Sequence, residues 1–430
     1  MKIFWFRRDL RLEDNKALNE ALRRDESVLP IFIFDTEIIS ELSKDDARLT
    51  FIYDCLKSID SELQSYGSSL MILQGNPQDV FRDLINEYAI TEVFFNKDFE
   101  PYGITRDEEV SKILAENGIG VSAHLDHIIF EPDAITKSDG KPYTVYTPFK
   151  NAWLKKFRID DIEVSEEQES RMELFYHSET TFPNMTELGF SRSDIKVESF
   201  SLEQSSLYKE QRDVPFIKGT TRLGPHLRFG TVSLRAIIRH LNLSNEGDAT
   251  LLNELIWREF FIQILFNFPH VISNNFRAKY DGIQWRNNPE DFQAWCSGKT
   301  GYPMVDAGMR ELNTTGYMHN RVRMIVAGFL CKHLLIDWKW GEAYFAEKLF
   351  DFELASNNGN WQWAAGTGCD AAPYFRVFNP TTQLEKFDPD LRYVKKYVEE
   401  YGTEDYVKPI VEHKFARERA LEAYKKGIMN

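Results

Sequence analysis

Short apolar runs alternate with amphipathic stretches along the first 130 residues of the chain. The apolar runs predict five strands, at residues 2–6, 28–34, 70–73, 92–96 and 120–124. Between the second and third runs, apolar residues recur at steps of three and four from Leu49 to Tyr66, which is typical of one face of a helix. Strands that alternate with helices predict an α/β domain with a Rossmann-like parallel sheet.

The turn after the first strand contains no glycine between Arg7 and Asn15. A dinucleotide-binding sheet needs a Gly-rich turn at this place, because only glycine lets the backbone approach a pyrophosphate closely. FAD and NAD are therefore not expected to bind this first domain through a Gly-rich turn after its first strand.

The pattern weakens between residues 131 and 200 and becomes helical from about residue 200 onward. We predict an α/β domain at 1–130, an interdomain linker at 131–200 and an all-α domain at 201–430. Helices are expected at 231–241, 248–267, 304–313, 318–335 and 340–349.

The negative charge of the chain is confined to its first half. The formal net charge is −15, but residues 1–200 carry 23 Lys and Arg against 39 Asp and Glu, whereas residues 201–430 carry 29 against 28. A polyanionic partner is therefore expected to bind the second half, where basic side chains can gather on one face.

Few features point to a membrane, a secreted protein or a metal. No apolar run approaches the roughly 20 residues that span a bilayer, and the N-terminus lacks a signal-peptide pattern. The four cysteines include no CxxC pair, so neither a disulfide framework nor a zinc site is indicated. We expect a cytoplasmic protein.

Four segments of the second half carry candidate chemistry. Residues 219–225 (GTTRLGP) could supply donors to a phosphate, although a capped turn with a surface Arg explains them as well. In residues 254–261, Glu254, Trp257 and Arg258 share one helix face and could stack on a base and bond its edge. A buried Trp beside a Glu–Arg pair is an equal alternative.

The other two segments are richer in polar side chains. In residues 317–324, Asn320, Arg323 and Met324 share a helix face while Arg321 points elsewhere; a generic amphipathic helix would look the same. Residues 351–363 (DFELASNNGNWQW) are dense in amides and run into two Trp residues. Burying so many amides costs free energy unless each finds a partner, which a polar cofactor would provide.

Together these segments resemble the photolyase/cryptochrome family. The resemblance runs from residues 4–11 (FWFRRDLR) to residues 409–414 and is most specific between residues 295 and 380. It implies an N-terminal α/β antenna domain and an all-helical C-terminal domain that holds FAD.

The resemblance also implies roles for single residues around the cofactor. It assigns the FAD diphosphate to Tyr208 and the turn Thr220, Thr221, Arg222, Leu223 and Gly224. It places an Arg323–Asp351 ion pair against the isoalloxazine ring and Asn357 at flavin N5. The remaining expected FAD contacts are Arg258, Asn320, Phe352 and Glu353. Trp361, Trp338 and Trp285 match the family's electron relay, through which photoexcited oxidised flavin draws an electron from solvent.

A second set of residues matches the family's pocket for a flipped-out pyrimidine dimer: Glu254, Trp257, Asn320, Met324 and Trp363. Contacts to the DNA nearby are expected from Arg212, Arg321 and Gln383. The apolar wall suits two linked thymines, while Glu254 and Asn320 can hydrogen-bond their polar edges. Glu254 and Asn357, with the three relay tryptophans, are the expected catalytic residues.

This pocket favours a class I cyclobutane pyrimidine dimer photolyase. Enzymes that act on the (6-4) photoproduct have a pair of histidines there, which His319 does not match, and cryptochromes replace Asn357 by Cys or Asp. The implied mechanism is electron donation from excited reduced FAD to the flipped dimer, ring splitting and electron return. Damaged DNA is the expected partner, and the chain is expected to be monomeric. A cryptochrome-like blue-light photoreceptor is the alternative, and a redox flavoprotein with no role on DNA is a third hypothesis.

The family also allows a second, antenna chromophore, a folate or a deazaflavin. Residues 99–103 (FEPYG) lack the Asn-Glu pair associated with folate-binding members. This departure argues against methenyltetrahydrofolate without establishing another antenna.

Overall fold

The computed structural model describes residues 1–23, 25–162 and 169–429, so residues 163–168 of the predicted linker lie outside the described residues. The chain forms two compact units, each assembled from more than one segment. The first unit comprises residues 1–135, 154–198 and 223–241, and the second comprises residues 136–153, 199–222 and 242–430.

The first unit is built on a parallel five-stranded sheet of order β3-β2-β1-β4-β5. Its strands are β1 (Lys2–Phe6), β2 (Val28–Asp35), β3 (Met71–Gly75), β4 (Glu92–Asn96) and β5 (Gly120–His124). The five predicted strands are confirmed, with small shifts at the ends of the second and third. Its helices are α1 (Lys16–Leu22), α2 (Thr36–Ile39), α3 (Ala47–Gln64), α4 (Pro77–Glu87), α5 (Pro101–Glu116), α8 (Leu223–Phe229) and α9 (Leu234–His240), with short 3₁₀ turns η1 (Ile159–Asp161) and η2 (Glu169–Leu174).

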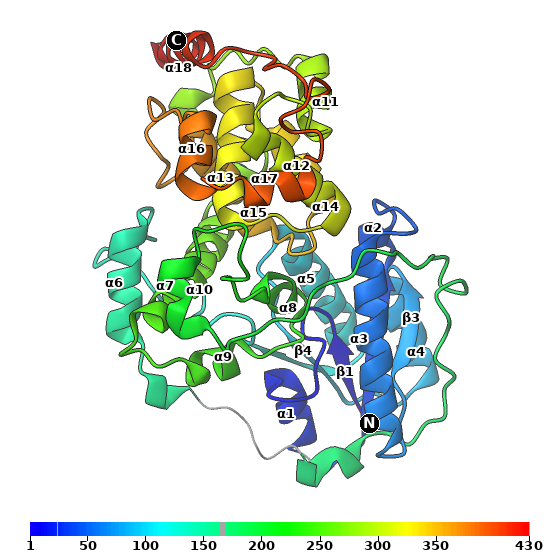
Figure 1. Ribbon diagram of the computed structural model, residues 1–430. Helices are drawn as coiled ribbons and strands as arrows, with labels where there is room; N and C mark the ends of the chain where they lie inside the picture. Colours follow the sequence, from blue (N-terminus) through cyan, green and yellow to red (C-terminus); the bar gives the residue numbers. More distant parts are fainter. Residues whose placement is uncertain (24, 163–168, 430) are drawn as a thin grey trace. The chain divides into compact units, whose positions relative to one another are not determined.

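Helices pack on both faces of this sheet, and α1, α3, α4 and α5 are labelled in Figure 1. Side chains of β1 alternate between the two faces: Phe4 and Phe6 pack in one core with apolar residues of α1 and α3. Ile3 and Trp5 pack in the opposite core with residues of α4 and α5. Because the central strands β1, β2 and β4 are buried almost throughout, they appear in the sequence as nearly unbroken apolar runs rather than alternating ones, whereas the edge strands β3 and β5 are partly exposed.

A buried network of charges ties α9 to the sheet domain. The Asp126 carboxylate accepts hydrogen bonds from Arg11 at 2.7 and 2.8 Å and from Arg235 at 2.8 Å. Arg235 also donates to Asp14 at 3.0 Å. Burial alone would raise the pKa of Asp126, but the two guanidinium groups hold it well below its ordinary value. The carboxylate therefore contributes stability that is present above its unfolded pKa near 4 and is lost as the pH falls through the lower folded pKa.

Replacing Asp126 by Asn should lower the free energy of unfolding of the first unit by roughly 1–3 kcal/mol, because two buried guanidinium groups lose their charged acceptor. The measurement is hydrogen exchange of the β1 and β4 amides at neutral pH. The control is Asp54→Asn, which breaks an Arg192 pair whose side chains are 55% and 50% exposed and should cost well under about 1 kcal/mol. Equal losses in the two variants would contradict the prediction.

The second unit is helical. Its elements are α6 (Tyr146–Lys156, of which residues 146–153 belong to this unit), η3 (Ser205–Leu207), α7 (Tyr208–Gln211), α10 (Glu246–Asn267), η4 (Pro269–Ile272), η5 (Ala278–Tyr280), α11 (Pro289–Cys296), α12 (Pro303–Thr315), α13 (Asn320–Gly328), a π-helix η6 (Phe329–Leu334), α14 (Trp338–Lys348), α15 (Leu354–Ala365), α16 (Pro380–Phe387), α17 (Arg392–Tyr397) and α18 (His413–Met429). The predicted α/β and all-α fold classes are thus both confirmed. The domain boundaries predicted at residues 130 and 200 stay a prediction.

Local chemistry sets the ends of the helices that build the site. The Asn245 side chain accepts hydrogen bonds from the backbone N–H groups of Gly247 and Asp248 and so begins α10. α15 ends at Gly366, whose φ of +89° is open to glycine at little cost. α13 begins at His319, whose Nδ1 accepts from the Arg321 N–H at 3.2 Å. Burial is the main reason that the pKa of His319 falls to about 4, which keeps the ring neutral and able to accept this bond.

No helix in the described part of the chain is long and apolar enough to cross a membrane.

Candidate functional site

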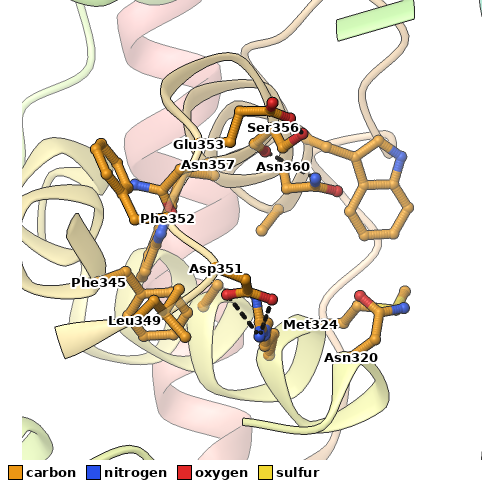
Figure 2. A pocket seen from close by; sticks show the side chains of 15 residues that line it. Asn320, Met324, Phe345, Leu349, Asp351, Phe352, Glu353, Ser356, Asn357 and Asn360 are labelled. Carbon is orange, nitrogen blue, oxygen red and sulfur yellow. Dashed lines mark hydrogen bonds and ion pairs between the residues drawn. The ribbon is translucent and has the colours of Figure 1, made fainter. Parts of the chain in front are cut away.

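A cavity lies in the second unit between α13, α14, α15 and the connection that precedes α15 (Figure 2). It is a concave site that combines aromatic rings with a few polar groups, as small-molecule and cofactor sites do. Its wall is lined by Asn320, Arg323, Met324, Ala327, Phe345, Leu349, Asp351, Phe352, Glu353, Ser356, Asn357, Asn360, Trp361, Trp363 and Ala364. It is therefore a mixed surface, with aromatic rings beside a small number of charged and amide groups.

The charged part of this wall is the Arg323–Asp351 ion pair, drawn with dashed lines in Figure 2. One terminal nitrogen of Arg323 donates to both Asp351 oxygens, at 3.1 and 2.9 Å. Its Nε donates to the Met318 carbonyl at 2.7 Å. Burial would lower the pKa of Arg323, but the Asp351 carboxylate raises it above its ordinary value. Arg323 therefore stays charged, and its bonds to Asp351 hold it in place at the wall of the cavity.

Asn357 presents an amide to the same cavity. Its Nδ2 donates to the backbone carbonyl of Glu342 at 3.0 Å and to the Glu342 carboxylate at 2.9 Å. Among the described residues no hydrogen bond reaches Asn357 Oδ1. The side chain is thus held by α14 through its nitrogen, and its oxygen is the atom available to a ligand.

A buried ion pair joins α10 to the start of α15. Arg258 donates to Glu353 at 2.7 Å, and the Ser356 hydroxyl donates to the second Glu353 oxygen at 3.0 Å. Phe352, the neighbouring residue, lines the cavity. These contacts fix the connection that carries Asp351.

A second, more open pocket of about 800 Å³ adjoins the first. It is lined by Arg212, Glu254, Trp257, Arg258, Phe261, Asn320, Met324, Ser356, Asn360 and Trp363. Asn320, Met324, Ser356, Asn360 and Trp363 line both pockets. Groups bound in the two pockets would therefore be separated only by this common wall.

Glu254 and Arg212 form an ion pair in the second pocket, with side chains 30% and 23% exposed. Burial raises the pKa of Glu254, and the Arg212 guanidinium opposes that rise. Glu254, Trp257 and Arg258 share a pocket because they lie three and four residues apart on α10, as their spacing indicates.

The predicted phosphate turn lies apart from both pockets. Thr220 Oγ1 is 3.3 Å from the Tyr317 hydroxyl, and the Arg222 guanidinium lies 3.5 Å from the centre of the Tyr317 ring. Tyr208 lies on α7, where its ring is 5.5 Å from the Arg212 guanidinium. Leu223 and Gly224 open α8 and belong to the first compact unit.

Arg321 and Gln383 line neither pocket as described. Arg321 pairs with Asp213 at 2.7 Å and lies 4.5 Å from the centre of the Phe387 ring, at the end of the helix that carries Gln383. Asn320, Arg323 and Met324 turn toward the cavity while Arg321 does not, so the two faces expected for this helix are present.

The three predicted relay tryptophans lie in the second unit's core. Trp361 lines the first cavity, and its ring lies against Gly341 of α14, where an added Cβ would be 2.1 Å from the indole. Trp338 begins that same helix and donates from its indole nitrogen to Asn275 at 2.9 Å. Trp285 is half-buried and meets the Tyr424 ring edge-on at 5.8 Å.

Sequence reasoning missed several residues of the site. Ser356, Asn360 and Phe261 line the pockets, and their spacing along α15 and α10 could have indicated them. Trp295, whose ring centroid is 6.1 Å from that of Trp361, gave no signal in the sequence beyond being a tryptophan.

A candidate site for a second ligand lies in the first unit, at the carboxyl ends of β1 and β4. These neighbouring strands form the switch point of the sheet, where open α/β sheets bind ligands. A small pocket there is lined by Arg7, Arg8, Asp9, Asn96, Lys97, Asp98, Asp126 and His127.

Two family models match the chain: "DNA photolyase" over residues 2–169 and "FAD binding domain of DNA photolyase" over residues 251–403. The deoxyribodipyrimidine photo-lyase of Escherichia coli is 38% identical, with 98% of each chain covered. A class III photolyase structure from Agrobacterium tumefaciens superposes with a TM-score of 0.89 and 34% identity, covering 100% of this chain and 98% of that one. An archaeal photolyase from Sulfolobus tokodaii, solved with two FAD molecules, gives a TM-score of 0.84 and 36% identity over 99% of each chain. The chain belongs to the DNA photolyase family.

Proposed function

We propose that this protein repairs cyclobutane pyrimidine dimers in DNA under blue light. The observation that carries the proposal is the pair of adjoining pockets that share one wall. The first has the aromatic rings, paired charges and amide groups that suit a flavin ring. The second joins a tryptophan, a carboxylate and an arginine, which suit a pyrimidine dimer extruded from the duplex.

The residues of the first cavity fit FAD. Arg323 and Asp351 offer a paired cation and anion, the Asn357 oxygen is not taken up by any described group, and Phe345, Phe352 and Trp361 offer aromatic surface. When bound, FAD supplies the light absorption and the electron for the reaction. The family match to an FAD binding domain agrees with this assignment.

The side chains of the second pocket would bind and orient the dimer. We assign stacking to Trp257 and Trp363, apolar contact to Met324, and hydrogen bonds at the pyrimidine edges to Glu254 and Asn320. Flipping the dimer out of the duplex costs a few kcal/mol and least at a damaged, poorly stacked site, so selectivity comes from the lesion as well as from the pocket. A cryptochrome-like photoreceptor has no need for these groups.

The test of the proposed function is dimer repair by the purified protein on a duplex with one thymine dimer, in blue light and in darkness. Repair in light alone, with tighter binding to the damaged than to the undamaged duplex, is expected. A protein that binds the two duplexes equally and repairs neither would overturn the proposal and favour the photoreceptor alternative. Class I membership stays a prediction, since the matching Agrobacterium structure is a class III photolyase.

Arg321 is proposed to contact the DNA backbone near the pocket. Replacing Arg321 by Ala should flatten the dependence of log affinity on log salt by about 0.9, the contribution of one neutralised phosphate on duplex DNA. Asp213, which pairs with Arg321 at 2.7 Å, provides the control: Asp213→Asn should raise affinity at low salt. An unchanged slope for Arg321→Ala would remove this residue from the interface.

A second chromophore in the first unit is also proposed, as the family allows. The small pocket at the ends of β1 and β4 is its candidate site. Its lining combines three basic side chains (Arg7, Arg8 and Lys97) with three acidic ones (Asp9, Asp98 and Asp126), which would favour a strongly polar group.

A further inference from the structure

One face of the Trp257 ring is covered by the protein itself. The ring of Tyr146 lies parallel to it, with centroids 3.6 Å apart and planes at 8°. Trp257 lines the second pocket, whereas Tyr146 is not among the described residues that line it. An indole has two faces, so the face turned away from Tyr146 is the one that a base in this pocket can stack on.

Tyr146 is itself held firmly. Its backbone N–H donates to the Asp370 carboxylate at 3.0 Å, and its hydroxyl donates to the Asn253 carbonyl at 2.9 Å. The ring is 7% exposed and meets Phe260 edge-on at 5.8 Å. A side chain anchored at both its backbone and its hydroxyl cannot turn without breaking a buried hydrogen bond.

The partners of Tyr146 belong to two of the segments that build the second pocket: one lies on α10 and the other just after α15. Asn253 precedes Trp257 by one turn of α10. Asp370 lies in the loop that follows α15, the helix that carries Trp363. Tyr146 comes from a third segment, the first residue of α6. It therefore ties the Trp257 wall to the Trp363 wall from behind the pocket.

We propose that Tyr146 is a positioning residue for dimer recognition, which holds Trp257 in the orientation that stacks on a flipped-out pyrimidine dimer. This rests on the proposed function of the pocket. A Trp257 ring already fixed by Tyr146 loses little side-chain freedom when the dimer binds, so more of the stacking free energy appears as affinity.

The test is a double-mutant cycle on binding to duplexes with and without a thymine dimer, using Tyr146→Leu, Trp257→Ala and the double variant. Tyr146→Leu should weaken dimer binding about five- to tenfold, the effect of losing one aromatic pair, and should change binding to undamaged DNA less than about twofold. In the Trp257→Ala background it should cause no further loss. Tyr146→Phe keeps the ring and should bind within about twofold of wild type.

Tyr143→Leu provides a matched control, because Tyr143 lies in the same segment and its ring contacts Phe149 and Lys137. It should bind both duplexes as wild type does. If Tyr146→Leu fails to retain FAD, Tyr146→Met replaces it in the cycle. Equal losses on the two duplexes, or an undiminished loss in the Trp257→Ala background, would overturn the proposal. If the wild-type protein binds the damaged and undamaged duplexes equally, the proposed function itself is wrong.

Discussion

Replacing Trp338 by Phe should leave FAD bound and nearly abolish light-driven reduction of the oxidised flavin in the purified protein. Trp338 is buried at the start of α14, the helix on which the Trp361 ring packs. Phenylalanine fills most of the same space, so the core should hold, but its ring is far harder to oxidise than an indole. The measurement is the loss of the oxidised flavin absorption under blue light with an external reductant. Repair that starts from chemically reduced flavin should survive.

Trp295 gives this experiment its control. It is fully buried, its ring centroid is 6.1 Å from that of Trp361, and its indole nitrogen donates to the Val326 carbonyl at 3.2 Å. Trp295→Phe therefore removes an equally buried indole whose ring lies near that of Trp361, and this variant should photoreduce as wild type does. If Trp295→Phe blocks photoreduction while Trp338→Phe does not, the electron reaches Trp361 through Trp295 rather than through Trp338, and the relay assignment is wrong.

The fold could be predicted from the sequence because both units follow simple patterns. The central strands of the first unit are buried on both faces, so they read as short apolar runs between turn residues. In the second unit, helices such as α12 and α13 keep a clear three- and four-residue period. The division into compact units could not be predicted in the same way. Residues 223–241 pack with the first unit through Arg235, and residues 136–153 pack with the second, which are contacts between distant segments that no local pattern encodes.

In the candidate site, too, the spacing of residues within one helix could be predicted, whereas tertiary contacts could not. Helical spacing predicts one shared face for Glu254, Trp257 and Arg258, and all three line one pocket. It also predicts that Arg321 and Arg323 point in different directions, as they do. Tyr146 could not be found this way, because it lies 111 residues before Trp257 and meets it only through tertiary packing. The Arg212–Glu254 ion pair could not be predicted from the sequence either. The sequence indicated both residues as candidates but not their contact with each other.

The Arg212–Glu254 ion pair affects how the second pocket would interact with a bound dimer. Glu254 is bonded to Arg212, while burial raises the pKa of its carboxyl. If Arg212 contacts a DNA phosphate, as the resemblance implies, and moves away from Glu254, the influence that opposes this rise is lost and the protonated form of Glu254 becomes more stable. A protonated carboxyl can donate to a pyrimidine carbonyl and stabilise negative charge that develops on the dimer. Since burial raises the pKa of Glu254, the protonated form persists above the ordinary carboxyl range and is lost as the pH rises through that raised pKa, so the repair yield should fall over the same rise in pH.

Trp257→Ala and Glu254→Ala should therefore fail in different ways. Trp257→Ala should weaken binding to dimer-containing DNA about ten- to a hundredfold, because base stacking on an aromatic side chain is worth about 1–3 kcal/mol, with a smaller loss on undamaged DNA. Glu254→Ala should lower the repair yield per absorbed photon more than it lowers affinity, and should remove the fall in yield with rising pH. Both should retain FAD, because Arg323, Asp351 and Asn357 are unchanged. Binding to damaged and undamaged duplexes and repair yield across pH, measured in parallel, check this. If the two variants lose affinity and yield in the same proportion, Glu254 and Trp257 do not have separate roles and this assignment of the pocket is wrong.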